Sequence, residues 1–298
     1  MVTRRQLRLP RKRPIKSYLT FLVLFNFYFV SFLSPFYKHK SNILNIAENG
    51  GNLDFSFADV IFIVSNPNAT AISRSATFAS TPSLGVTSSR SGKKYLNIIT
   101  AGADFNVFKA YLLTHELGHT FGLPDLYSYD QMRRQNEFVG EWSIMGSLNE
   151  GATVKDYLGW EKWLLGWLLD SQIMCVKKIP KSNTLVNIVS LEISSSNNDI
   201  KLVVIKLSET HALAIESRRL TSNQNSGLLI YLIDTSVSTG NGGIRILEEN
   251  GSSTTNNSNE DKMKSILTSP GQMLHFMDVT VKYLSKMLNM DVLEVVVA

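Results

Sequence analysis

The sequence predicts an α+β fold, in which a region with helices is followed by a β-rich, sandwich-like region. Two segments, Asn106–Phe121 and Val154–Leu169, have apolar residues near helical spacing and contain strong helix formers. After Asp170 the pattern changes to short β-branched apolar runs separated by Ser, Asn and Gly clusters. Such runs are typical of a β-sandwich or barrel. We therefore expect helices mainly before residue 171 and strands after it.

Strands are also expected ahead of the first of these helices. Ala58–Ser65 (ADVIFIVS) is a continuous apolar run of the length of a buried strand, and Tyr95–Thr100 (YLNIIT) is a second one. A short strand is expected at Ala76–Ala79, within a loop region rich in Ser, Thr, Pro and Asn. Residues 41–57 are polar and interrupted by glycine, so no regular element is predicted there.

Composition identifies a globular chain and argues against nucleic-acid binding. Of the 298 residues, 44% are hydrophobic and 18% charged, which is too apolar for a disordered protein. The net charge of +5 comes from the first forty residues, which hold nine Lys or Arg and no acid. The remainder has 21 basic against 25 acidic residues, about −4, so no nucleic-acid partner is expected. The single cysteine, Cys175, excludes an internal disulfide and a cysteine-based zinc cluster.

The N-terminal region, residues 1–40, predicts membrane targeting. Lys16 and Lys38 bracket 21 uncharged residues, 17–37, which is long enough for a helix to cross a bilayer. The preceding basic arm keeps the N-terminus cytosolic and directs the remaining chain to the lumenal or extracellular side. An uncleaved signal-anchor is favoured over a cleaved signal peptide, because no small-residue cleavage site follows the apolar stretch. A buried helix of the folded domain is the least favoured alternative.

Three glycosylation acceptors agree with this location. Asn68, Asn250 and Asn256 each begin an Asn-x-Ser/Thr triplet in polar, loop-like surroundings. Such triplets also arise by chance in a chain rich in Ser and Asn. We therefore expect a membrane-anchored glycoprotein, or a secreted one if the N-terminal segment is cleaved.

The predicted helix 106–121 contains His115-Glu116-Leu117-Gly118-His119. Residues four apart lie on one face of a helix, so both imidazoles can reach one zinc ion. Glu116, beside the first histidine, can then take a proton from a zinc-bound water as general base. The alternative is a solvated helix face whose histidines bind nothing.

Residues after the helix favour the zinc site. Gly122, with Pro124, ends the helix at a position where a tight turn can direct the chain back toward the metal. Asp125 stands ten residues after His115, the place of the third ligand in the extended H-E-x-x-H-x-x-G-x-x-H pattern. Trp142-Ser-Ile-Met145-Gly then matches the methionine turn of that class of protease.

These motifs resemble the immune inhibitor A family of secreted zinc metallopeptidases. The likeness is carried by HELGHTFGLPDLY (115–127), EFVGEWSIMG (137–146) and LGWEKWLLGWL (158–168), and is strongest across 110–170. It continues more weakly in DFSFADVIFIV upstream and in HALAIESRRL and GLLIYLID downstream. The resemblance implies that His115 and His119 bind zinc, that Glu116 is the general base and that Met145 is the methionine of the turn.

The third zinc ligand stays open between two carboxylates. Asp125 occupies the position of the extended motif, and a carboxylate oxygen is a good zinc ligand. Glu137 matches a glutamate that recurs in the family just before the methionine turn, and the resemblance narrowly favours it. In that case Asp125 would orient a ligating histidine. No tyrosine follows Met145 within two residues, so the group that stabilises the oxyanion is unassigned.

The resemblance gives the expected domains and function. Residues 41–170 would be a metzincin-like zinc peptidase domain and 171–298 a β-rich domain. The front half is short for the family, since only 38–114 separate the apolar stretch from His115. We expect a zinc metalloendopeptidase acting on protein or peptide substrates; bound calcium is left open. A catalytically silent adhesion or binding protein is the alternative. An intramembrane protease is excluded, because the zinc helix is flanked by polar loops.

Overall fold

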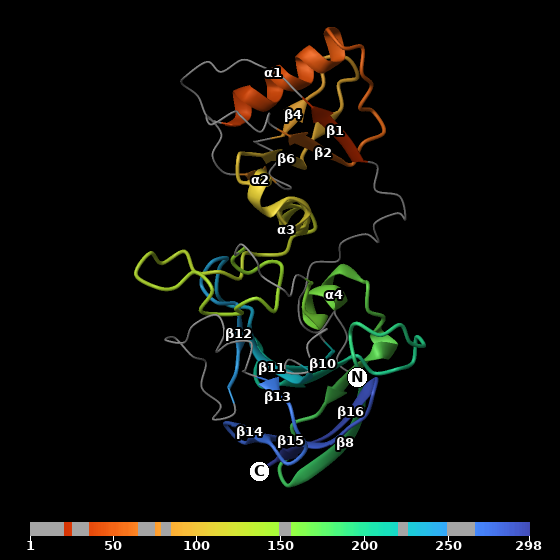
Figure 1. Ribbon diagram of the computed structural model, residues 1–298, viewed down its shortest axis with the longest axis vertical. Coiled ribbons are helices and arrows are strands. Elements are labelled where there is room, and N and C mark those ends of the chain that lie inside the picture. The colour runs from red at the N-terminus through yellow and green to blue at the C-terminus, as the bar shows by residue number, and fades with distance from the viewer. Residues whose placement is uncertain are drawn as a thin grey trace. The chain divides into compact units, whose positions relative to one another are not determined.

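The computed structural model describes residues 21–25, 36–64, 75–78, 85–148, 156–219, 226–248 and 266–298 (Figure 1). The fold is mixed α+β, with few helices in the described ranges and a β-rich C-terminal region of largely antiparallel sheets. The chain divides into an N-terminal unit, which extends to the turn after the helix at 110–120, and a C-terminal unit. The predicted fold class is confirmed at this level.

The N-terminal unit is built on a four-stranded sheet of order β1-β2-β6-β3. Strands β1 (Phe21–Phe25), β2 (Val60–Val64) and β6 (Ile98–Ala101) are parallel, and β3 (Ala76–Phe78) is an antiparallel edge. A separate two-stranded hairpin joins β4 (Val86–Thr87) to β5 (Lys94–Tyr95). The strands expected at 58–65 and 76–79 are confirmed, and the one expected at 95–100 is divided between β5 and β6.

Helices cover both faces of this sheet. On one face, α1 (Phe36–Asn49) packs Ile43, Leu44 and Ala47 against alternate residues of β2, among them Ile61 and Ile63. On the other face, the remaining β2 residues Val60 and Phe62 contact Leu113 and Leu117 of α3 (Ala110–Thr120). Successive side chains of a strand point to opposite faces, so a strand covered on both faces is apolar throughout. This explains the continuous apolar run of β2.

Two helix predictions need correction. Residues 36–49 form α1, although 41–57 was expected to be irregular. Its residues Ile43, Leu44 and Ala47 are buried, and Gly50 and Gly51 follow its end rather than interrupt it. The helix expected at 106–121 is broken into α2 (Phe105–Phe108) and α3, because Lys109 between them has φ 51°, a left-handed conformation that no helical residue adopts.

Only part of the apolar stretch 17–37 is described. Residues 21–25 pair with β2, from Phe21 opposite Val60 to Phe25 opposite Val64, and Phe36 begins α1. None of the helices in the described ranges has the length and apolar character needed to span a membrane. Asn68, Asn250 and Asn256 lie outside the described residues.

Two sheets form the body of the C-terminal unit. One follows the order β12-β11-β10-β9-β7, with β13 also paired to β11, and the other follows β14-β15-β16-β8. All pairs are antiparallel except β7 with β9. The strands are β7 (Ile173–Val176), β8 (Ser182–Val189), β9 (Leu202–Lys206), β10 (His211–Arg218), β11 (Gly227–Asp234), β12 (Ile244–Ile246), β13 (Ile266–Leu267), β14 (Met273–Phe276), β15 (Val279–Lys286) and β16 (Met290–Val297).

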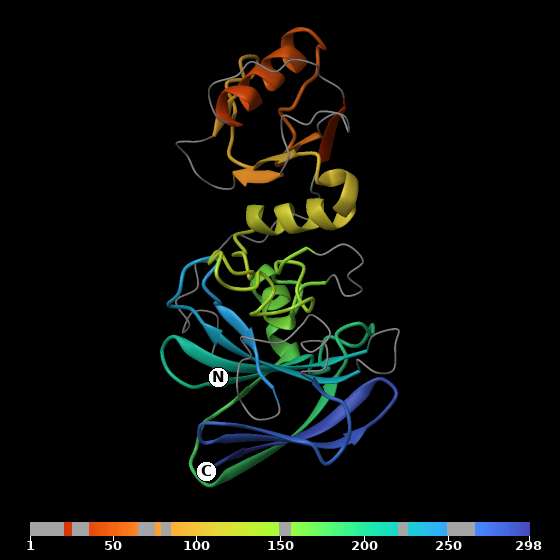
Figure 2. The same ribbon diagram turned by 60° about the vertical axis from the view of Figure 1, so that its left-hand side comes forward.

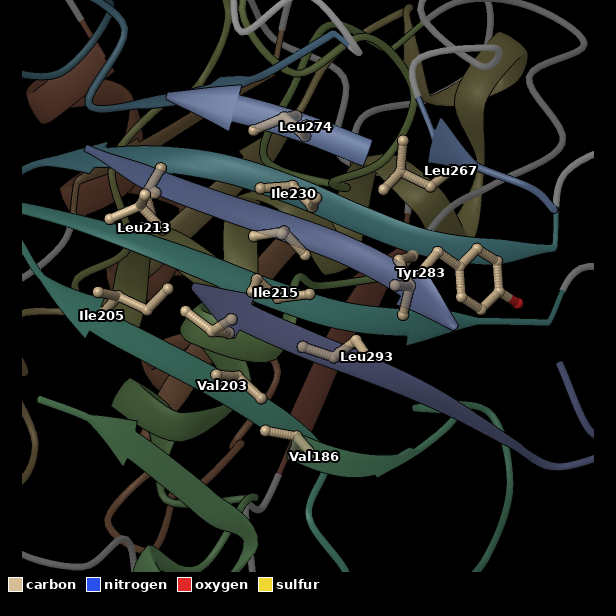
Figure 3. Close-up of a cluster of buried hydrophobic side chains, with 14 of the residues drawn as sticks. Val186, Val203, Ile205, Leu213, Ile215, Ile230, Leu267, Leu274, Tyr283 and Leu293 are labelled. Atoms are coloured by element: carbon tan, nitrogen blue, oxygen red, sulfur yellow. The ribbon is translucent and has the colours of Figure 1, made fainter. Parts of the chain in front are cut away.

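The two sheets pack face to face around one hydrophobic core. Figure 3 shows Ile215 and Ile230 of one sheet, together with Tyr283 and Leu293 of the other, among the side chains of this core. Figure 2 shows the two sheets as separate layers. In β16 buried and half-buried residues alternate, as expected for a strand with one face on the core. The prediction of a β-rich region after residue 170 is confirmed.

The other face of the six-stranded sheet is also covered. From His211 onward β10 is buried at almost every position, so the strand has a second packed face. Helix α4 (Gly159–Leu165) lies there: the Glu216 carboxylate accepts the Gly159 N–H at 2.6 Å, and the Tyr231 hydroxyl accepts that of Trp160 at 3.1 Å. A short 3₁₀ turn, Asp170–Gln172, connects α4 to β7.

Helix α4 is shorter than the helix expected at 154–169. Residues 156–158 are not helical, and Gly166 ends α4 in the left-handed conformation with φ 80°. Of the three tryptophans expected to face the core, Trp160 and Trp163 are buried, whereas Trp167 lies beyond the helix end and is 52% exposed. The core-facing stripe is therefore confirmed for two positions only.

Candidate metal centre

Helix α3 turns its two histidines away from the sheet. Leu113 and Leu117 contact β2 and β6, and a residue two positions along an α-helix lies on nearly the opposite side. His115 and His119 therefore lie together on the side away from the sheet, with ring centroids 4.9 Å apart and planes at 89°. Leucine packing on the sheet thus fixes the face that carries the imidazoles.

The end of α3 redirects the chain at Gly122. The Leu123 N–H donates to the Gly118 carbonyl at 3.1 Å, and the Gly122 N–H donates to the His119 carbonyl at 2.9 Å. This pair of bonds is the Schellman motif, which requires a left-handed residue, and Gly122 has φ 90°. The glycine predicted to turn the chain is confirmed in that role.

The same turn sets the tautomer of the neutral His119 ring. Its Nδ1 lies 2.9 Å from the carbonyl oxygen of Leu123. A carbonyl oxygen only accepts, so Nδ1 carries the proton of the neutral ring and Nε2 keeps its lone pair. Metal-binding histidines are typically oriented by such a bond from the second ring nitrogen. His119 is therefore prepared to bind a metal through Nε2.

Asp125 completes a group of three potential metal ligands. One nitrogen each of His115 and His119 and one carboxylate oxygen of Asp125 all lie within 4.8 Å of one another, in the continuous segment 115–125. His115 and Asp125 are buried and His119 is partly buried. Two imidazoles and a carboxylate are a common protein ligand set for zinc and leave a fourth position open. The residues present therefore fit a zinc ion.

Glu116 is buried beside His115, on the N-terminal unit's own helix. Lys40 of α1 is also buried: it is 1% exposed, and its ammonium group donates to the Ile98 carbonyl at 3.2 Å. Burial lowers the pKa of Lys40 to about 8, and the negative charge of Glu116 acts in the opposite direction. The sequence analysis counted Lys40 only among the basic residues of the first forty, with no sign of this burial.

Glu137, the other candidate ligand, is not a member of the group of three. Its side chain is buried, and a carboxylate oxygen accepts a hydrogen bond from the Arg133 guanidinium at 3.0 Å. Arg133 is four residues earlier in the chain and is itself half-exposed. The described geometry thus brings Asp125 to the histidines and gives Glu137 an arginine partner.

The Met145 turn is joined to the segment that follows Asp125. The Met145 carbonyl accepts the Leu126 N–H at 2.8 Å, and the Met145 side chain is fully buried. The Met145 N–H donates to Ser143 Oγ at 3.0 Å, and that hydroxyl donates to Glu161 of α4 at 2.7 Å. A buried carboxylate of α4 therefore supports the turn.

A buried ion network lies next to this turn. Arg218 is 1% exposed, donates to Glu216 at 2.9 Å and to Glu192 at 2.6 Å, and has its guanidinium 5.3 Å from the Trp142 ring centroid. The two carboxylates keep the pKa of Arg218 above its usual value although burial lowers it. Arg218 and Glu216 lie in β10, within the HALAIESRRL segment. The contact between Arg218 and Trp142 therefore joins β10 to the Trp142–Met145 turn.

Sequence reasoning missed the residues that contact Asp125 from a distant loop. The Asp125 N–H donates to Thr239 Oγ1 at 2.9 Å, and the Gly240 N–H donates to the Asp125 carbonyl at 3.1 Å. The only sequence signal was the run Thr239-Gly-Asn-Gly-Gly, which by itself predicts a turn.

Comparison with protein-family models, curated proteins and solved structures finds no match for the chain.

Proposed function

We propose that this chain is a zinc-dependent endopeptidase that hydrolyses peptide bonds of proteins or peptides on the lumenal or extracellular side. One observation carries the proposal: the donor atoms of His115, His119 and Asp125 converge within 4.8 Å, with the buried Glu116 on the same helix. The H-E-x-x-H spacing and the resemblance of 110–170 to the immune inhibitor A family support it.

The proposal includes a metzincin-like catalytic domain. A parallel sheet with an antiparallel edge strand, and a zinc helix packed on one face, are consistent with it. His115, His119 and Asp125 would hold the zinc, which when bound lowers the pKa of a water to about 7 and polarises the substrate carbonyl. Glu116 would accept the proton of the attacking water and return it to the leaving amine.

The test uses the full chain and two variants. His119→Ala removes a metal ligand, so we expect loss of bound zinc, measured by metal analysis after dialysis. Glu116→Gln has nearly the same shape but cannot take a proton. We expect it to fold and keep zinc while casein hydrolysis falls at least about 10²–10⁴-fold, mainly in kcat.

Matched controls are available in the C-terminal unit. His275 is exposed on β14 and Glu209 is 87% exposed, so His275→Ala and Glu209→Gln should leave zinc content and hydrolysis unchanged. Full zinc occupancy in His119→Ala would refute the metal site. Bound zinc without hydrolysis of any protein or peptide by the wild-type chain would instead support the silent binding protein.

A further inference from the structure

The loop between β11 and β12, residues 235–243, forms hydrogen bonds with both backbone groups of Asp125, the N–H and the carbonyl. Thr239 Oγ1 accepts the Asp125 N–H at 2.9 Å, and the Gly240 N–H donates to the Asp125 carbonyl at 3.1 Å. The Gly240 carbonyl then accepts the Tyr129 N–H at 3.1 Å. The loop therefore fixes the backbone of both Asp125 and Tyr129.

Tyr129 in turn fixes the Asp125 side chain. Its hydroxyl donates a hydrogen bond to Oδ2 of Asp125. This bond fixes the orientation of the Asp125 carboxylate.

Gly240 makes room for the ring of Tyr129. A β-carbon at this position would lie 2.3 Å from the nearest ring carbon, far inside van der Waals contact, and the backbone has φ 74°. Both observations require glycine at this position. Gly242 repeats the device two residues later: its β-carbon would lie 2.9 Å from the Phe138 ring, and it has φ 78°. The loop is thus shaped to the 125–138 segment.

We infer that Thr239, Gly240 and Tyr129 are positioning residues that orient the Asp125 carboxylate for zinc. The inference rests on the proposed function, in which Asp125 is the third ligand. Two of the three positioning residues, Thr239 and Gly240, lie in the loop that follows β11. Partners behind a metal ligand typically contribute about 10–100-fold in metal affinity.

The test is zinc affinity of the full chain, measured by competition with a chromophoric chelator. Tyr129→Phe removes only the hydroxyl, and Gly240→Ala displaces the ring. We expect each to weaken zinc binding about 10–100-fold and to change the visible absorption spectrum of the Co²⁺-substituted protein. Gly271→Ala is the matched control: Gly271 also has a left-handed φ of 95°, but a β-carbon there meets no atom within 4 Å.

The outcomes separate this inference from the proposed function. If the wild-type chain binds no zinc, or His119→Ala retains it, the proposed function fails. If the wild-type chain binds zinc and Tyr129→Phe binds it equally well with an unchanged Co²⁺ spectrum, the inference is overturned while the zinc site stands. Equal affinities of Asp125→Ala and wild type would overturn it too. Should Gly240→Ala fail to fold, Tyr129→Phe still decides the question.

Discussion

Glu161 gives a prediction that can be worked out quantitatively. It is fully buried in α4, and its Oε2 accepts the Leu158 N–H at 2.8 Å and the Ser143 hydroxyl at 2.7 Å. Within the described part of the chain, Oε1 is buried without a hydrogen-bond partner. The negative charge of this carboxylate is therefore poorly solvated, at a position directly behind the Met145 turn.

Burial raises the pKa of Glu161 from 4.5 to about 7; the charges of Glu216 and Asp156 act in the same direction, and the bonds from Leu158 and Ser143 oppose it. Between these two pH values the folded chain holds a proton that the unfolded chain has lost. The free energy of unfolding therefore falls as pH rises from 4.5 to 7. One pKa unit corresponds to about 1.4 kcal/mol, so the total loss is about 3 kcal/mol.

Glu161→Gln removes this titration while keeping an acceptor for Ser143 and Leu158. We expect the stability difference between the variant and the wild type to shift by about 2–3 kcal/mol in favour of the variant between pH 5 and pH 8. Urea unfolding followed by circular dichroism measures it, with EDTA present because metal binding to histidines is itself pH-dependent.

Comparison across pH isolates the titration, because any constant packing cost of the amide cancels. Glu209→Gln, which changes an exposed carboxylate, is the control and should leave the pH dependence unchanged. If Glu161→Gln and the wild type differ by the same amount at pH 5 and pH 8, Glu161 does not titrate in this range and the argument from burial is refuted.

Three further predictions concern ligands, charge and location. Asp125→Ala should reduce zinc affinity more than about 100-fold, whereas Glu137→Ala, which removes one of the two carboxylate partners of Arg133, should retain zinc. The reverse order in the same chelator competition would make Glu137 the ligand. Burial lowers the pKa of Lys40 from 10.5 to about 8, so its charge destabilises the fold at neutral pH. Lys40→Met should therefore unfold at a higher urea concentration than the wild type at pH 7. The variant should also lack the rise in stability that the wild type shows from pH 8 to 10.5. Membrane attachment through 17–37 predicts that alkaline carbonate leaves the full chain in the membrane pellet; release would instead fit the pairing of Phe21–Phe25 with β2.

Local patterns predicted the elements whose burial is evident from their own residues. The apolar runs at 202–206, 211–218 and 227–234 are β9, β10 and β11, because a strand of a sandwich must bury its side chains whatever its partner is. The helix at 36–49 was missed for the opposite reason. Its polar residues give little helical periodicity, and its stability depends on packing against β2 and β4, which the local sequence does not reveal.

The candidate metal centre shows the same division between local and distant information. Histidines four apart on a helix, and a glycine that reverses the chain, are features of eleven consecutive residues, so the motif could be predicted from spacing. The third ligand that we propose could not be predicted in this way, because Asp125 is held by Thr239 and Gly240, more than a hundred positions away in sequence. Carboxylates that bind metals are typically held by further hydrogen bonds. In the inference drawn above, these bonds come from a loop whose sequence alone predicts no more than a turn.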